Sequence, residues 1–258
     1  MSAVLEVEHL GRRFGGLDAV HDVSFSLDEA QTLGVIGPNG AGKSTLVNLI
    51  TGHLKPTSGS VVIDGRDVTG AKPWVIAKAR VARTFQIVKP FRDLTVRENV
   101  AIGSMFGPTR ARSSREAIGR AGEVLERVGL ADRAEAQPGN LSVADARRLE
   151  LAKALATRQR LLLLDEVMAG LRPREIEAAL ELIRSLRDDG ITILVVEHVM
   201  KAIMSVSDSV LVMHEGGELA HGPPQEIVED ERVIEAYLGE RYAERMRARR
   251  RAEENADA

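Results

Sequence analysis

The sequence predicts an α/β domain in which helices cover both faces of a parallel sheet. Short runs of Leu, Ile and Val without alternation occur at residues 161–164 and 191–196, as expected for parallel strands that are buried on both faces. A helical pattern over residues 174–187 separates the two runs and completes a strand–helix–strand unit. A buried strand, a glycine-rich loop and a helix follow one another over residues 32–50, which is the arrangement of many phosphate-binding α/β proteins.

The first third of the chain predicts strands of two kinds. Residues 4–8 and 20–27 alternate apolar and polar side chains, as half-buried strands do. Residues 61–63 end at the turn pair Asp64-Gly65 and predict another antiparallel strand. Residues 32–36 predict a short buried strand, and residues 44–50, apolar on one face, predict the helix after the glycine-rich loop.

The middle of the chain is predicted to be helical. Thr95 and Glu98 fit a capping box that opens a helix, and residues 115–128 predict a second helix. Ser142 can cap a third helix that runs to about residue 155.

Strand character returns in the last third, where residues 209–213 predict another parallel strand. We therefore expect one domain over residues 1–239, with a helical subdomain inserted at about residues 87–155. A charged tail over residues 240–258 follows it.

The composition excludes several functional classes. The 258 residues contain no cysteine, which rules out disulfides, thiol nucleophiles and cysteine-ligated zinc. The formal net charge is −3 and aromatic residues are 3% of the chain, so we expect no nucleic-acid partner. No apolar run approaches the roughly 20 residues that a membrane-spanning helix needs.

The glycine-rich loop carries the strongest chemical signal. It matches the pattern G-x-x-x-x-G-K-[ST] in full and reads Gly37, Pro38, Asn39, Gly40, Ala41, Gly42, Lys43 and Ser44. Glycines let successive N–H groups point at phosphate oxygens, and the N-terminus of the following helix adds its positive end. Lys43 supplies a charge for the β- and γ-phosphates, and the Ser44 hydroxyl can ligate Mg²⁺. We count Thr45 with this nucleotide site; the alternative is a flexible loop with a solvated lysine.

Two acids follow the strand at residues 161–164. Asp165 and Glu166 are expected to emerge at the carboxyl end of the sheet, where α/β proteins bind ligands. Asp165 can hold Mg²⁺, and Glu166 is placed to polarise an attacking water. The alternative is a pair of acids that cap the next helix. A guanine-reading Asn-Lys-x-Asp motif is absent from the sequence, which favours adenine.

A histidine follows the neighbouring strand. Glu197 and His198 come directly after residues 191–196, and His198 could bind the γ-phosphate and sense its loss. A single histidine at a strand end is more often structural. Here the strand order is expected to place it beside Asp165 and Glu166, which favours a functional role.

In this order the motifs resemble those of the nucleotide-binding subunit of an ATP-binding cassette (ABC) transporter, over nearly the whole chain. The resemblance implies an ABC ATPase fold: a P-loop NTPase (RecA-like) core, an antiparallel β subdomain and an inserted helical subdomain. It also implies Mg²⁺-dependent ATP hydrolysis. Phe14 matches the aromatic residue that stacks on adenine, and Gln86 matches the glutamine that reaches the Mg²⁺ and the water. Asp165 and Glu166 match the metal-holding and catalytic acids, and His198 matches the switch histidine.

Within that family the chain most resembles the larger ATPase subunit of branched-chain amino-acid importers. The segments that carry this resemblance are residues 14–17, 82–86, 91–99, 147–155, 165–171, 197–198 and 233–240. It implies transmembrane permease subunits, a second ABC ATPase subunit in a hetero- or homodimer and, indirectly, a substrate-binding protein. The expected location is peripheral, on the cytoplasmic face of the inner membrane. Importers of other amino acids, amides or urea, lipopolysaccharide exporters, non-transport cassettes and P-loop kinases remain alternatives.

One motif departs from the family pattern. The signature Leu-Ser-Gly-Gly-Gln is replaced by Leu141, Ser142, Val143, Ala144 and Asp145. The resemblance implies that Leu141 and Ser142 contact ATP held by the partner's phosphate loop. Val143 should hinder the close backbone approach that glycine allows, and Asp145 adds a negative charge near phosphate. We therefore expect an asymmetric dimer, with one complete site and one impaired site.

Two more segments match places of contact in the family. Residues 169–171 match the D-loop, which crosses the dimer interface. Residues 88–96, with Phe91 and Arg92, are the expected groove for a cytoplasmic helix of the permease; the alternative is an ordinary exposed loop.

Overall fold

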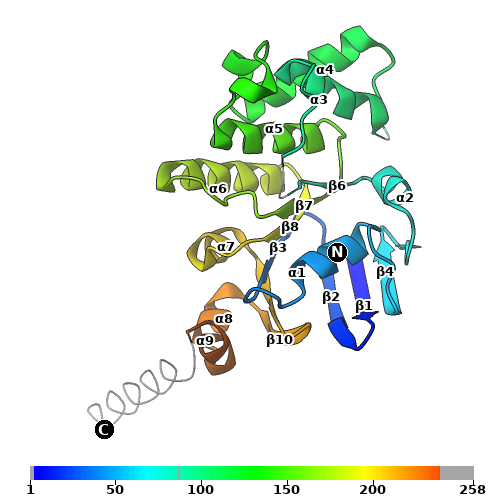
Figure 1. The fold of residues 1–258 in the computed structure, drawn as a ribbon, viewed down its shortest axis with the longest axis vertical. Coiled ribbons are helices and arrows are strands. Elements are labelled where there is room, and N and C mark those ends of the chain that lie inside the picture. Colours follow the sequence, from blue (N-terminus) through cyan, green and yellow to red (C-terminus); the bar gives the residue numbers. More distant parts are fainter. Residues whose placement is uncertain (1–2, 86–87, 108, 239–258) are drawn as a thin grey trace.

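An antiparallel sheet of four strands, in the order β2-β1-β4-β5, forms one end of the molecule (Figure 1). In this computed structural model, which describes residues 3–85, 88–107 and 109–238, its strands are β1 (Ala3–Phe14), β2 (Leu17–Asp28), β4 (Ser58–Ile63) and β5 (Arg66–Asp67). β1 and β2 are longer than predicted because their pairing continues to a tight hairpin, where Phe14 lies opposite Leu17. The ends of both strands are exposed and lack alternation, so the sequence pattern did not reveal them.

A second sheet has six strands in the order β10-β9-β3-β8-β7-β6. Its strands are β3 (Thr32–Ile36), β6 (Val81–Arg83), β7 (Leu161–Asp165), β8 (Thr192–Val196), β9 (Ser209–His214) and β10 (Gly217–Gly222). All neighbours are parallel except β9 and β10, which form an antiparallel pair. The four predicted parallel strands are confirmed, whereas β6 and β10 were not predicted.

The parallel sheet is buried on both faces. Leu161 and Leu163 of β7 pack in one core, which also holds side chains of α1 (Lys43–Ile50) and of the antiparallel sheet. Leu162 and Leu164 pack on the other face, in a core shared with the helices that follow β6. Consecutive residues of one strand therefore serve opposite cores, which explains why these strands read as continuous apolar runs.

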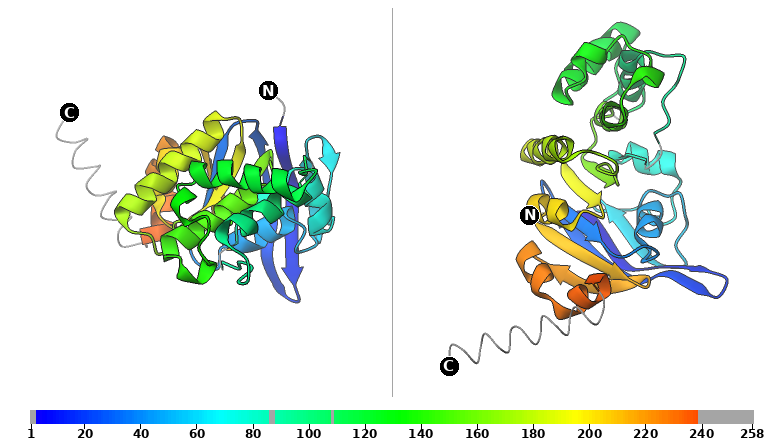
Figure 2. Two further views of the ribbon diagram at one scale, coloured as in Figure 1. Left: turned by 90° about the horizontal axis from the view of Figure 1, so that it is seen from above. Right: turned by 60° about the vertical axis from the view of Figure 1, so that its left-hand side comes forward.

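The helices of residues 96–155 occupy the other end of the molecule. The right-hand view of Figure 2 shows the helical layer (green) at one end and the antiparallel sheet (blue) at the other. The helices after α1 are α2 (Pro73–Lys78), α3 (Val96–Phe106), α4 (Ser114–Arg127), α5 (Val143–Leu155), α6 (Pro173–Asp188), α7 (Met200–Val206), α8 (Pro224–Glu229) and α9 (Glu231–Leu238). Two short 3₁₀ turns, Ala131–Arg133 and Pro138–Asn140, link α4 to α5. None of the helices in the described ranges is long and apolar enough to cross a membrane.

The predicted helix caps are present. The Thr95 hydroxyl accepts a hydrogen bond from the Glu98 backbone N–H, and the Glu98 carboxylate accepts one from the Thr95 N–H in return. The Ser142 hydroxyl caps α5 by accepting a hydrogen bond from the Asp145 N–H at 3.1 Å. The charged tail of residues 240–258 lies outside the described residues.

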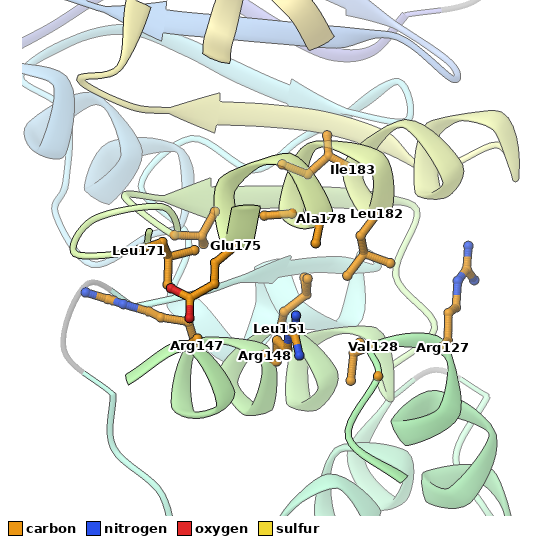
Figure 3. Close-up of a pocket in the computed structure, with 14 residues that line it drawn as sticks. Arg127, Val128, Arg147, Arg148, Leu151, Leu171, Glu175, Ala178, Leu182 and Ile183 are labelled. Carbon is orange, nitrogen blue, oxygen red and sulfur yellow. The ribbon is translucent and has the colours of Figure 1, made fainter. Parts of the chain in front are cut away.

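The helical layer meets the rest of the molecule across a cavity of about 230 Å³ between α5 and α6 (Figure 3). Apolar side chains such as Leu151, Leu182 and Ile183 line it, and Arg127 and Arg147 stand at its opposite ends in the view. The cavity opens to solvent, so it is a groove between α5 and α6 and not a void inside either core.

Candidate nucleotide site

The glycine-rich loop lies between β3 and α1, and glycine is required at two of its positions. A Cβ atom at Gly37 would lie 2.3 Å from the Met213 carbonyl oxygen. Gly42 has a φ of 96°, and a Cβ atom there would lie 2.4 Å from the Ala19 carbonyl oxygen. The loop can thus fold tightly against β9 and the β2 hairpin only because these positions carry no side chain.

Lys43 is buried at the start of α1. Its ammonium group donates hydrogen bonds to the Gly37 carbonyl oxygen at 2.7 Å and to the Pro38 carbonyl oxygen at 2.9 Å. Burial lowers the pKa of Lys43, and the nearby Glu166 and Asp165 carboxylates oppose this shift. The charge is therefore held inside the loop by neutral oxygens, so an anionic ligand in the loop would be attracted to it.

The ends of β7 and β8 bring Glu166 and His198 together. The two strands are parallel neighbours, with Asp165 opposite Val196. The Glu166 backbone N–H donates to the Val196 carbonyl oxygen at 2.9 Å, and Glu166 adopts a left-handed conformation with a φ of 51°. A hydrogen bond joins the Glu166 carboxylate to the His198 ring Nε2. The acid and the histidine therefore share one edge of the sheet.

These groups line one open cavity of about 490 Å³ together with the phosphate loop. The predicted site residues that line it are Asn39, Gly40, Ala41, Gly42, Lys43, Ser44, Thr45, Glu166 and His198. Leu17, Asp18 and Ala19 of the β1–β2 hairpin form another wall. The cavity thus combines a cation and backbone donors for an anion with a carboxylate and an imidazole for proton transfer.

Asp165 lies deeper and pairs with an arginine that the sequence analysis did not assign. The Arg83 guanidinium donates to the Asp165 carboxylate at 2.7 Å and to the Asn48 side-chain oxygen at 2.6 Å. The Asp165 side chain is buried and the Arg83 side chain is 11% exposed. Arg83 comes from β6, a strand of three residues that was not predicted, so nothing in the sequence indicated that it would face Asp165.

Ser44 and Asp165 are the candidate magnesium ligands, and Asp165 would have to share its carboxylate between Mg²⁺ and Arg83. Ser44 and Asp165 both line a second cavity, of about 850 Å³, and both offer hard oxygen donors. Within the described part of the chain there is no group of three or more His, Cys, Asp or Glu residues that could hold a metal ion. A cation at Ser44 and Asp165 would therefore need phosphate oxygens and waters to complete its shell, as Mg²⁺ commonly does in nucleotide sites.

Other predicted site residues lie elsewhere. Phe14 is exposed on the β1–β2 hairpin with the Arg12 guanidinium 4.6 Å from its ring centroid, and it does not line the cavity. Leu141 and Ser142 precede and cap α5, in the helical layer, and do not line it either. Gln86 lies outside the described residues.

The C-terminal helix α9 reaches the phosphate loop. The Tyr237 hydroxyl is hydrogen-bonded by the backbone N–H of Gly37, and burial raises the pKa of Tyr237 to about 12. This segment carries part of the family resemblance, but its sequence predicts no contact with the site. The contact joins α9 to the phosphate loop, two segments far apart in the sequence, so it follows from the fold and not from a local pattern.

Known families and relatives match the chain over most of its length. A family model described as ABC transporter matches residues 20–169, and one described as branched-chain amino acid ATP-binding cassette transporter matches residues 219–243. The high-affinity branched-chain amino acid transport ATP-binding protein LivG of Salmonella typhimurium is 43% identical over 250 residues, which are 92% of this chain and 98% of that protein. BraF of Pseudomonas aeruginosa, which carries the same description, is 42% identical with the same coverage.

Solved structures agree with this assignment. A nucleotide-free ATP-binding cassette from an ABC transporter superimposes with a TM-score of 0.85 at 30% identity, covering 93% of this chain and all of that one. The ADP conformation of an ATP-binding cassette gives a TM-score of 0.84, also at 30% identity and with the same coverage. The predicted ABC ATPase fold is confirmed. The chain belongs to the ABC transporter family and is one of its ATP-hydrolysing subunits.

Proposed function

We propose that this chain powers the uptake of branched-chain amino acids, as a peripheral subunit on the cytoplasmic face of the inner membrane. The observation that carries the proposal is the 43% identity, over 92% of the chain, to a transport ATP-binding protein for these substrates. The match at residues 219–243 points the same way. An ATPase subunit does not touch the cargo, so the substrate rests on these relatives.

The partners of this function are two transmembrane permease subunits, a second ABC ATPase subunit and, indirectly, a substrate-binding protein. The test is purification of the tagged chain from detergent-solubilised membranes. We expect a polytopic membrane protein and a second cassette to be recovered with it. Recovery of the chain alone, with its ATPase activity intact, would favour a cassette that works without a membrane partner.

Each of the residues described above has its own role in ATP hydrolysis. The N–H groups of the loop and the Lys43 ammonium bind the phosphates, and Ser44 and Asp165 would hold Mg²⁺. When bound, Mg²⁺ would neutralise negative charge on the phosphates. Glu166 orients the attacking water and accepts its proton, while His198 holds the Glu166 carboxylate in place. Nothing is attributed to Gln86 beyond the role that the family resemblance implies.

The start of α5 supports an impaired signature. The Ser142 hydroxyl accepts a hydrogen bond from the Asp145 N–H at 3.1 Å and donates one to the Asp145 carboxylate at 2.9 Å. Asp145 thus engages Ser142 as both donor and acceptor, and its negative charge stands where a phosphate would have to approach. Val143, at 63% exposure, adds a branched side chain on the outer surface of the same turn. These contacts favour an asymmetric dimer.

Restoring the signature is expected to raise hydrolysis at the second site. We consider a dimer in which Glu166→Gln silences the first site, so that only the partner's phosphate loop and this chain's α5 turn over ATP. Adding Val143→Gly, Ala144→Gly and Asp145→Gln should increase the single-turnover rate by about tenfold or more, because each recovered phosphate contact is worth about one such factor. Asp145→Asn alone separates the effect of charge from that of backbone access. Equal rates with and without the triple change would contradict the asymmetry.

Residues 88–96, beside the second cavity, are our candidate groove for a cytoplasmic helix of the permease. The second cavity is lined by Trp74, Phe85 and Lys89, and Phe91 lies at 53% exposure in the segment that follows. The buried Asn99 side chain fixes the backbone of that segment: its oxygen accepts from the Phe91 N–H at 2.8 Å and its nitrogen donates to the Phe91 carbonyl oxygen at 3.0 Å. An exposed aromatic ring on a rigid backbone is typical of an interface anchor.

A photo-crosslinking amino acid at position 91 should therefore capture a permease subunit in the assembled transporter. Phe106, at 81% exposure on the last residue of α3, is the matched control, because it is an exposed phenylalanine of the helical layer outside the groove. We expect the adduct from position 91 and none from position 106, as read by mass spectrometry of the crosslinked bands. The same adducts from both positions, or none from position 91, would remove this docking assignment.

A further inference from the structure

Glu197 is a buried carboxylate that the hydrolysis mechanism does not use. It follows β8 directly and has 1% exposure. Its Oε1 atom accepts a hydrogen bond from the Met168 backbone N–H at 2.6 Å, and the carboxylate also accepts one from the His198 backbone N–H. Burying a carboxylate costs free energy unless hydrogen bonds replace those lost to water. The two backbone donors offset this cost and hold the Glu197 carboxylate in one position.

The two donors belong to the two loops that carry the reactive side chains. Met168 lies two residues after Glu166, and His198 is the residue next to Glu197. The ladder between β7 and β8 ends with the bond from the Glu166 N–H to the Val196 carbonyl oxygen. Past that last backbone bond, the Glu197 carboxylate links the two chain segments through its hydrogen bond to the Met168 N–H. It therefore ties the loop after β7 to the loop after β8.

The electrostatics agree with this position. Burial raises the pKa of Glu197, and the Glu166 carboxylate acts in the same direction, while the Met168 and His198 N–H groups and the His198 ring lower it. A glutamine would fill the same space, but it would carry no negative charge and its NH₂ group could not accept a hydrogen bond. A carboxylate offers acceptor oxygens on both sides, and hydrogen bonds to an ionised acceptor are stronger than those to a neutral one.

We propose that Glu197 is a positioning residue that keeps His198 and Glu166 in contact and couples that contact to residues 167–170. This inference rests on the proposed function, since it concerns the same hydrolysis site. When His198 shifts on phosphate loss, the shared carboxylate moves the Met168 backbone with it. The event at the γ-phosphate is thereby transmitted to the turn that leads into α6, next to the segment that the family resemblance places at the dimer interface.

The test is Glu197→Gln in the chain assembled with its partner subunit. We expect kcat for ATP hydrolysis to fall by about tenfold or more, because the reacting groups lose their relative placement. The affinity for a fluorescent ATP analogue should stay close to that of the unmodified chain, because Glu197 does not touch the phosphate loop. Asp208→Asn is the control: Asp208 is an exposed carboxylate that accepts a hydrogen bond from the Thr32 N–H at 2.8 Å, at the amino end of β3 and away from Glu197. It should leave kcat unchanged.

A double-mutant cycle with His198→Ala separates positioning from general destabilisation. If Glu197 acts through His198, then Glu197→Gln should cause little further loss of kcat once His198 is absent. Should Glu197→Gln fail to fold, Glu197→Asp retains the charge and shortens its reach, and we expect the same fall in kcat. A kcat equal to that of Asp208→Asn, or fully additive losses in the cycle, would overturn the proposal.

Failure of this inference is distinguishable from failure of the proposed function. If the unmodified chain with its partner does not hydrolyse ATP, the proposed function is wrong. If it does hydrolyse ATP and Glu197→Gln is equally active, only the role of Glu197 is wrong.

Discussion

Glu166→Gln should lower kcat for ATP hydrolysis by about a hundredfold or more, because general-base catalysis commonly contributes a factor of 10²–10⁴. Glutamine has the same shape and can keep a hydrogen bond to His198, but it cannot accept a proton from water. ATP affinity should be retained, because the loop and Lys43 are unchanged. The measurement is steady-state hydrolysis by the assembled dimer, together with equilibrium binding of ATP.

The control for this change is Glu177→Gln, which removes a carboxylate from the exposed face of α6. It should hydrolyse ATP at the rate of the unmodified chain. A Glu166→Gln variant that kept most of its kcat would show that another group serves as the base. Asp165 and Glu197 would then be the carboxylates to examine, since both lie at the same edge of the sheet.

Lys43→Met should weaken ATP binding by about a hundredfold, since hydrogen bonds to charged groups are worth up to about 3 kcal/mol. The same change should stabilise the free chain. The Lys43 ammonium is buried with carbonyl oxygens as its partners, and methionine fills similar space without a charge to desolvate. We expect urea unfolding without nucleotide to give a higher unfolding free energy for Lys43→Met than for the unmodified chain.

The pH dependence of the unfolding free energy gives a second test of whether Lys43 destabilises the free chain. Burial lowers the pKa of Lys43 below its ordinary value of 10.5, so the unfolded chain binds this proton more tightly than the folded chain. The stability contribution of Lys43 therefore rises with pH, between the lowered pKa and 10.5. The advantage of Lys43→Met should be full at neutral pH and shrink across that window. A variant less stable than the unmodified chain at neutral pH would contradict this account.

Much of the fold was predictable because its signals are local. The apolar runs at residues 161–164 and 191–196 are β7 and β8, and the caps at Thr95 and Ser142 are formed. The phosphate loop lies between a strand and a helix, as its pattern predicts. Each of these features is decided by neighbours in sequence, through continuous apolar runs, capping or backbone freedom.

The remaining features depend on contacts between distant segments. Arg83 reaches Asp165 only because β6 joins the edge of the sheet, and three residues are too few to show a strand pattern. Glu197 precedes His198, which the sequence motifs identify. Its carboxylate reaches the Met168 backbone only because β7 pairs with β8. Phe14 keeps its predicted adenine-stacking role as a proposal: it pairs with Leu17 of the cavity wall, and its ring lies against the Arg12 guanidinium.

The most direct test of the whole account is ATP-driven leucine uptake into proteoliposomes that contain this chain, the second cassette and both permease subunits, with the binding protein outside. Each cassette's catalytic glutamate is replaced by glutamine in turn. We predict that Glu166→Gln reduces uptake to the level without ATP, while the equivalent change in the second cassette leaves substantial uptake. ATP hydrolysis without uptake of any branched-chain amino acid would contradict the proposed function. Equal loss of uptake from either change would contradict the asymmetric dimer.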